Sequence, residues 1–198
     1  ALAMNGSATV VRSGCMAKDA DMILSEFILL GIGGKELSEE NAAQTAKALN
    51  IIQPDFIRVH ATGIKLESKL GEFVRDGSFT LQSEEEIVIE QKLFLQQLHE
   101  MDSYYVNEHI VNLLLEVRGN LRTEKQEMLS TIDRFLTLPP DERLLFTVGR
   151  RLNIFFRLDD LKKPKLHQKA GESLQQILSK NPHVDFAALC NYVRQSQI

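Results

Sequence analysis

The apolar residues follow helical spacing in some segments and strand-like runs in others, which predicts an α/β fold. Val10, Val11, Cys15 and Met16 recur at helical spacing within 7–20. Residues 22–30 then form a nearly continuous apolar run of strand length, closed by the glycine turn 31–34. Because such a run between a helix and a glycine turn is typical of a parallel strand, we expect this strand to be buried on both faces.

A second strand is predicted one helix further along the chain. Ser38 and the acidic residues after it are typical of a helix start, and Pro54 marks the exit of that helix. Residues 55–61 are rich in β-branched and aromatic side chains, as strands are. A strand, a helix and a strand in this order predict a βαβ unit with two parallel strands.

The rest of the chain is predicted to be mainly helical. Pro139 and Pro140 mark the best internal boundary, so we expect an α/β part over 1–138 and a helical extension over 139–198. The pattern indicates helices over 66–76, 83–100, 122–136, 140–155, 166–180 and 184–195, a short strand over 103–106, and either a helix or a strand over 109–117.

Composition and charge exclude several classes of function. The chain has 198 residues with 43% hydrophobic and 25% charged side chains, as in globular proteins. Its formal net charge of −4 argues against a general nucleic-acid binder, and the excess of bases after residue 150 is interpreted as a solvated helical face. No apolar run approaches the roughly 20 residues that cross a bilayer, so no membrane partner is expected.

The cysteine count is the most consequential single number. Cys15 and Cys190 cannot form a cysteine-based zinc finger or hold an iron–sulfur cluster through three or four thiolates. Both are interpreted as buried small residues of a protein in the reducing cytoplasm. The histidines show no metal-ligand spacing, although His109 could form a polar cluster with Glu108 and Asn112, so no metal site is expected.

Two loops follow the predicted strands, at the edge where open α/β sheets bind their ligands. They span 31–36 and 61–64. Glycines let the backbone approach a ligand closely, and the helix start at Ser38 offers unpaired amides to an anionic group. Glycine turns after strands also serve as plain connectors, and the sequence leaves both interpretations open.

Three polar residues inside the two strands are the catalytic candidates: Glu26, Arg58 and His60. Glu26 shares a strand face with Ile28 and Leu30, and a carboxylate there is costly unless it is paired or functional. One interpretation is an ion pair between Glu26 and Arg58. The other is a polar cavity lined by the three candidates, in which His60 donates to a ligand or acts as a general acid or base.

The segment 24–42 (LSEFILLGIGGKELSEENA), followed by 50–60 (NIIQPDFIRVH), resembles the radical S-adenosylmethionine superfamily, in the group often labelled iron–sulfur oxidoreductases. Residues 65–79 resemble the loop and short helix that follow the sixth barrel strand of that family. Residues 107–114 are similar to its closing segment, and 137–151 to its helical tail. The resemblance runs from Ser7 to the mid-150s and keeps the order and spacing of several elements.

The resemblance implies a partial (β/α) barrel with few parallel strands over 1–138, followed by a mostly helical extension over 139–198. It also implies that the fifth and sixth strands contact the adenosine and methionine parts of S-adenosylmethionine. By position, the cofactor-binding residues would be Gly31, Gly33, Gly34, Arg58 and Ala61.

The chain departs from the family pattern at three places. Asp21 stands where a glycine is usual, and Thr62-Gly63 lacks the proline common in that loop. The family's three-cysteine loop, which follows the first barrel strand, has no counterpart here. We therefore expect S-adenosylmethionine and a four-iron–four-sulfur cluster as cofactors of a parent enzyme. We expect neither to be bound by this chain, which would be inactive alone.

Two functions follow as hypotheses. In the first, the chain is the C-terminal part of a radical S-adenosylmethionine oxidoreductase that acts on an unknown substrate. In the second, it is a non-catalytic oligomeric binding or assembly module derived from a half-barrel. Both predict a partner, either an N-terminal half or a second copy in a homo-oligomer, because unpaired strand edges and apolar faces need cover.

Overall fold

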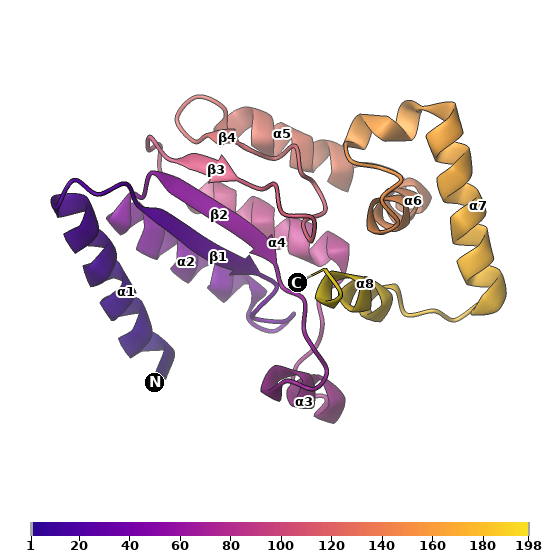
Figure 1. Cartoon of the computed structure of the whole chain (residues 1–198), viewed down its shortest axis with the longest axis horizontal. Helices are drawn as coiled ribbons and strands as arrows, with labels where there is room; N and C mark the ends of the chain where they lie inside the picture. The colour runs from indigo at the N-terminus through magenta and orange to yellow at the C-terminus, as the bar shows by residue number, and fades with distance from the viewer. Residues whose placement is uncertain (1, 198) are drawn as a thin grey trace.

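The computed structural model describes residues 2–197, with side chains from residue 8 onward. One sheet has its helices on one side, while the last helices lie beyond the end of the strands (Figure 1). The elements are α1 (Leu2–Asp19), β1 (Ser25–Leu30), α2 (Ser38–Ile52), β2 (Phe56–Ala61), α3 (Lys69–Asp76), α4 (Glu84–Gln97), β3 (Tyr104–Val106), β4 (Gly119–Asn120), α5 (Lys125–Leu136), α6 (Pro140–Arg151), a 3₁₀ turn (Leu158–Lys162), α7 (Pro164–Lys180) and α8 (Phe186–Gln195).

The sheet is mixed, with the strand order β1-β2-β3-β4. β1 and β2 run parallel in a register that pairs Ser25 with Phe56 and Leu30 with Ala61. β3 is parallel to β2, and the short β4 is antiparallel to β3. The predicted parallel βαβ unit and the α/β class are therefore confirmed, while β4 was not predicted.

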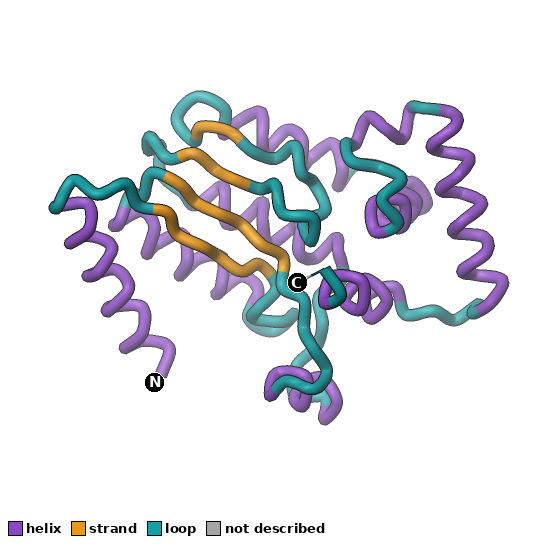
Figure 2. Tube along the Cα trace, in the orientation of Figure 1, coloured by secondary structure: helices purple, strands orange, loops and turns teal. Residues whose placement is uncertain are grey.

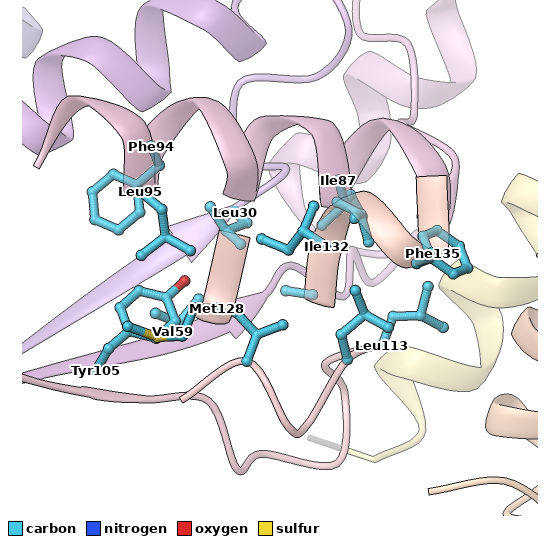
Figure 3. Packing of buried hydrophobic residues seen from close by; sticks show 14 of the residues in the cluster. Leu30, Val59, Ile87, Phe94, Leu95, Tyr105, Leu113, Met128, Ile132 and Phe135 are labelled. Carbon is cyan, nitrogen blue, oxygen red and sulfur yellow. The ribbon is translucent and has the colours of Figure 1, made fainter. Parts of the chain in front are cut away.

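The core lies between the sheet and the helices α2, α4 and α5 (Figures 2 and 3). β1 and β2 contribute the side chains that alternate toward these helices, since successive residues of a strand point to opposite faces. α4 begins with a capping box in which the Ser83 hydroxyl accepts from the Glu86 amide and the Glu86 carboxylate accepts from the Ser83 amide. The core side chains labelled in Figure 3 are Leu30, Val59, Ile87, Phe94, Leu95, Tyr105, Leu113, Met128, Ile132 and Phe135.

The expectation that the first strand is buried on both faces is wrong. β1 is the edge strand of the sheet, and its side chains Phe27 and Leu29 are 64% and 47% exposed. The helices α2 and α4 pack against each other on the same side of the sheet, so the opposite face is open (Figure 2). A continuous apolar run looks the same in a sequence whether this chain or another surface covers its second face.

Residues 109–117 form neither a helix nor a strand. They form a turn-rich loop that Asn112 ties to β2, because its side-chain amide donates to the Val59 carbonyl and its Oδ1 accepts from the Ala61 amide, each at 2.7 Å. This asparagine supplies the hydrogen bonds that a paired strand would otherwise make. An apolar stretch can therefore be buried without regular structure.

α6 ends at Arg151, four residues earlier than predicted. The chain reverses through Asn153, which has a φ of 57°, and the amides of Ile154 and Phe155 both donate to the Gly149 carbonyl. A Cβ at Gly149 would lie 2.3 Å from the Phe155 ring, so glycine is required for this close approach.

Pro139 and Pro140 lie at the start of α6, as expected from the sequence. Buried residues from both sides of this point, such as Ile28 and Phe146, belong to one hydrophobic cluster. The division into 1–138 and 139–198 stays a prediction. None of the described helices is long and apolar enough to cross a membrane.

Candidate functional site

The two parallel strands end side by side, with Leu30 paired to Ala61. The turn 31–37 and the loop 62–68 therefore leave the sheet at the same edge (Figure 1). This is the edge at which open α/β sheets carry their binding residues. The parallel register thus brings the two sequence-predicted loops together.

Arg58 lies on the open face of the sheet, directly opposite Phe27 in the register. Its guanidinium carbon is 5.9 Å from the ring centroids of both Phe27 and Phe56, a distance at which cation–π attraction operates. Its Nε donates to the Ser25 hydroxyl at 3.0 Å. Two aromatic rings and one hydrogen bond therefore hold the guanidinium in place.

His60 lies next to Arg58 on the same face and contacts a second histidine. Its ring centroid is 4.3 Å from that of His109, which comes from the loop after β3, and Phe27 meets His60 edge-on at 5.5 Å. Burial lowers the pKa of His60, and the charges of His109 and Arg58 lower it further. His60 is therefore biased toward the neutral imidazole, which can both donate and accept.

The predicted ion pair between Glu26 and Arg58 is wrong. Glu26 is paired with Ile57 in the register, so its side chain lies on the helix-covered face, whereas Arg58 lies on the open face. Partial burial raises the pKa of Glu26, because water stabilises its carboxylate less there. Of the three catalytic candidates, the fold brings Arg58 and His60 together and separates Glu26 from both.

The glycine turn after β1 is shaped by the protein's own packing. Gly31 and Gly34 have φ values of 83° and 63°, which favour glycine. A Cβ at Gly34 would lie 2.9 Å from the Thr80 carbonyl oxygen, and one at Gly33 would lie 2.9 Å from the Leu37 carbonyl oxygen. The connector interpretation therefore accounts for all three glycines, whatever the turn binds.

Glu90, which was not among the residues predicted from the sequence, holds the glycine turn in place. This buried carboxylate accepts hydrogen bonds from the Gly31 amide at 3.2 Å, the Ser38 hydroxyl at 2.9 Å and the Asn41 side-chain amide at 2.7 Å. A carboxylate within the apolar pattern of 83–100 was the available signal. The Glu90 carboxylate therefore joins the start of α2 to α4.

Part of the glycine turn borders a groove between α1 and α2. The groove has a volume of about 680 Å³, and its lining includes Val11, Gly33, Leu37 and Ile51. Among the described residues, the amides of Ile32 and Gly33 have no hydrogen-bond partner. The amide of Ala61, in contrast, is engaged by Asn112, and its side chain is buried.

A buried ionic cluster fastens α8 to the carboxyl edge of the sheet. Arg151 donates to Glu84 from Nε at 3.0 Å and from Nη2 at 2.5 Å, and Arg194 donates to the same carboxylate. Asn191 accepts from the Ile64 amide at 2.8 Å and donates to its carbonyl at 3.0 Å. The C-terminal bases were expected on a solvated face, but Arg150, Arg151 and Arg194 are buried.

The described residues offer no metal centre, because no group of three or more His, Cys, Asp or Glu side chains among them could hold an ion. Both cysteines are free thiols. Burial, followed by the nearby charge of Glu84, raises the pKa of Cys190 to about 12, so this thiol stays protonated at neutral pH. The described part of the chain thus lacks the thiolates that an iron–sulfur cluster requires.

Comparison of the chain with protein-family models, curated proteins and solved structures finds no match.

Proposed function

We propose that the chain is the C-terminal part of a radical S-adenosylmethionine iron–sulfur oxidoreductase. It would contribute the adenosine-side and substrate-side walls of the barrel. The observation that carries the proposal is the arrangement of β1 and β2, which are adjacent, parallel and covered by helices on one face only. The resemblance of 24–42 and 50–60 to that family supports the same assignment.

The open face has the character of a barrel interior. In a (β/α) barrel the helices lie outside, and the inward side chains of the strands face one another. Phe27, Arg58 and His60 take this inward position, and the free edge of β1 is where a preceding strand would pair. A partial barrel accounts for both features together.

The residues at the carboxyl edge fit part of an S-adenosylmethionine site. When bound, this cofactor would supply the chemistry of hydrogen abstraction from a substrate, with the electron coming from the cluster of the parent enzyme. The unpaired amides of Ile32 and Gly33 would donate to its polar groups, and His60 lies on the open face one residue before the end of β2. The cluster does not fit the described residues, so its cysteines would come from another part of the parent enzyme.

Titration of the ¹⁵N-labelled chain with S-adenosylmethionine tests the proposal. We expect chemical-shift changes at the amides of Ile32 and Gly33, and a loss of binding in Gly33→Val. The matched control is Gly171→Ala, which adds a methyl group where nothing lies within 4 Å. Shifts that are absent, or that Gly33→Val leaves unchanged while its spectrum stays folded, would contradict the proposal.

Anaerobic reconstitution with iron and sulfide tests the origin of the cluster. We expect the full-length parent to gain iron–sulfur absorption, whereas this chain gains none. A parent reading frame without a Cys-x-x-x-Cys-x-x-Cys loop would exclude the enzymatic assignment.

The second candidate function is a non-catalytic oligomeric binding or assembly module. The exposure of Phe27 and Leu29 on the open face and the free edge of β1 favour it, because a second copy could cover both. Light scattering of the purified chain discriminates the two. A dimer that Phe27→Asp dissociates supports the module, and a monomer at all concentrations contradicts it.

A further inference from the structure

On the open face, the guanidinium of Arg58 donates a hydrogen bond from Nε only, within the described part of the chain. Arg58 is held by its Nε, which donates to Ser25, and by the rings of Phe27 and Phe56. Among the described residues, its two terminal nitrogens donate to no acceptor. A planar guanidinium fixed at one nitrogen presents the remaining N–H groups in the fork that matches a carboxylate or a phosphate.

Positive charge on this face lacks a carboxylate counterpart within the described chain. Arg58, His60 and His109 lie together, whereas Glu26 points to the opposite face. Glu108, the neighbour of His109, is paired with Arg118. Burial and then repulsion by His109 and Arg58 lower the pKa of His60, and an anion placed between these groups would relieve the repulsion.

Exposed aromatic side chains lie on the open face beside the guanidinium. Phe27 and Tyr104 are exposed on the same face, on the strands that flank β2, and Phe56 of β2 is paired with Tyr104. A ligand whose anionic group reaches Arg58 would therefore rest its body on aromatic rings. Aromatic faces favour planar apolar groups over extended polar ones.

We propose that the open face binds an oxyanion, a carboxylate or a phosphate monoester, carried on a planar apolar body. Arg58 binds the oxyanion through both terminal nitrogens, and His60 and His109 donate to it from one side. Phe27 and Tyr104 form the floor under the apolar body. If the chain has the proposed function, the bound molecule is the substrate. Only this identification of the ligand rests on the proposed function.

Three small probes test the site on the chain as it stands: benzoate, phenyl phosphate and the neutral benzamide, at matched ionic strength. We expect benzoate or phenyl phosphate to shift the imidazole signals of His60 and His109, and benzamide to leave them unmoved. The two anions distinguish a carboxylate site from a phosphate site. Equal shifts with benzamide, or no shift with either anion, would overturn the proposal.

Variants of Arg58 separate bidentate binding from general attraction. We expect Arg58→Gln to weaken the binding of the better anion at least tenfold, and Arg58→Lys to weaken it at least threefold, because a lysine keeps the charge without the fork. The control is Arg122→Gln, which removes an exposed arginine paired with Asp102. Unchanged affinity in a folded Arg58→Gln would refute the assignment.

The test is independent of the cofactor experiment. Anion binding without S-adenosylmethionine binding would support this site and contradict the proposed enzyme. The reverse result would leave the enzyme assignment intact and remove the anion site.

Discussion

Arg194 donates to the buried carboxylate of Glu84, across 110 positions of the chain, and so joins α8 to the first turn of α4. Arg151 donates to the same carboxylate, so one acid neutralises two buried guanidiniums. Loss of the carboxylate would leave both cations without an ionised partner in a medium of low polarity. This cluster therefore helps to hold the last helix against α4, together with the hydrogen bonds between Asn191 and Ile64.

We predict that Glu84→Gln lowers the free energy of unfolding by about 3–5 kcal/mol, as is usual when one partner of a buried ion pair is removed. The control is Glu85→Gln, which acts on the more exposed pair between Glu85 and Arg143 and should cost under about 1 kcal/mol. Urea unfolding curves measure both. Equal costs for the two variants would show that the buried pairing is not the source of the stability.

The same carboxylate predicts a dependence of stability on pH. Burial alone would raise the pKa of Glu84, but Arg151 and Arg194 more than offset it, so the folded-state pKa lies below its ordinary value of 4.5. The stabilisation is therefore present above the unfolded pKa and is lost as the pH falls through the folded one. We expect the stability difference between wild type and Glu84→Gln to shrink on acidification. A difference that is constant from pH 7 to pH 3 would contradict this.

Gly34 should resist substitution for reasons of backbone geometry. Its φ is 63°, and a Cβ there would lie 2.9 Å from the Thr80 carbonyl oxygen. We predict that Gly34→Ala costs about 1–3 kcal/mol, the usual range for a strained backbone position. Gly171→Ala, in the open middle of α7, should instead stabilise by about 0.5–1 kcal/mol. Thermal unfolding of the two alanine variants shows whether the signs differ.

Asn112 should be essential for the loop that carries His109. It pairs with Val59 and Ala61 in the buried interior, and alanine would leave both backbone groups without partners. We predict that Asn112→Ala lowers the free energy of unfolding by about 2–6 kcal/mol, since each of the two buried polar groups left without a partner costs about 1–3 kcal/mol. Asn181→Ala, at an exposed turn, is the control and should have little effect. Urea denaturation measures both.

The histidine pair predicts a titration that can be followed directly. Burial is the largest cause of the lowered pKa of His60, followed by the charges of His109 and Arg58. We expect His60 to titrate below its ordinary value of 6.5, and His109→Gln to raise its pKa by removing one cation. Imidazole signals recorded against pH measure this. A His60 pKa above 6.5 in wild type, or an unchanged His60 pKa in His109→Gln, would contradict this prediction.

Much of the secondary structure was predictable because its causes are local. Ser38 and Pro54 placed α2, and the β-branched and aromatic residues of 55–61 placed β2, within a residue or two. The helix predicted from residue 83 begins one residue later, at Glu84. Pro54 follows the end of α2 and Pro140 begins α6, as expected because the proline ring is tolerated in the first turn of a helix but not in its interior. The parallel pairing of β1 with β2 was also predictable, because two neighbouring strands that are joined by a helical crossover run in the same direction.

The tertiary structure decided which faces meet. Alternation placed Glu26 on one face of its strand and Arg58 on one face of the next, but only the register showed that these faces are opposite. His109 reaches His60 because β3 joins the sheet beside β2, which no local pattern encodes. The sequence thus determined the elements through interactions a few residues apart. The open face, the buried arginines and the histidine contact depend on residues distant in the chain, so only the folded structure determines them.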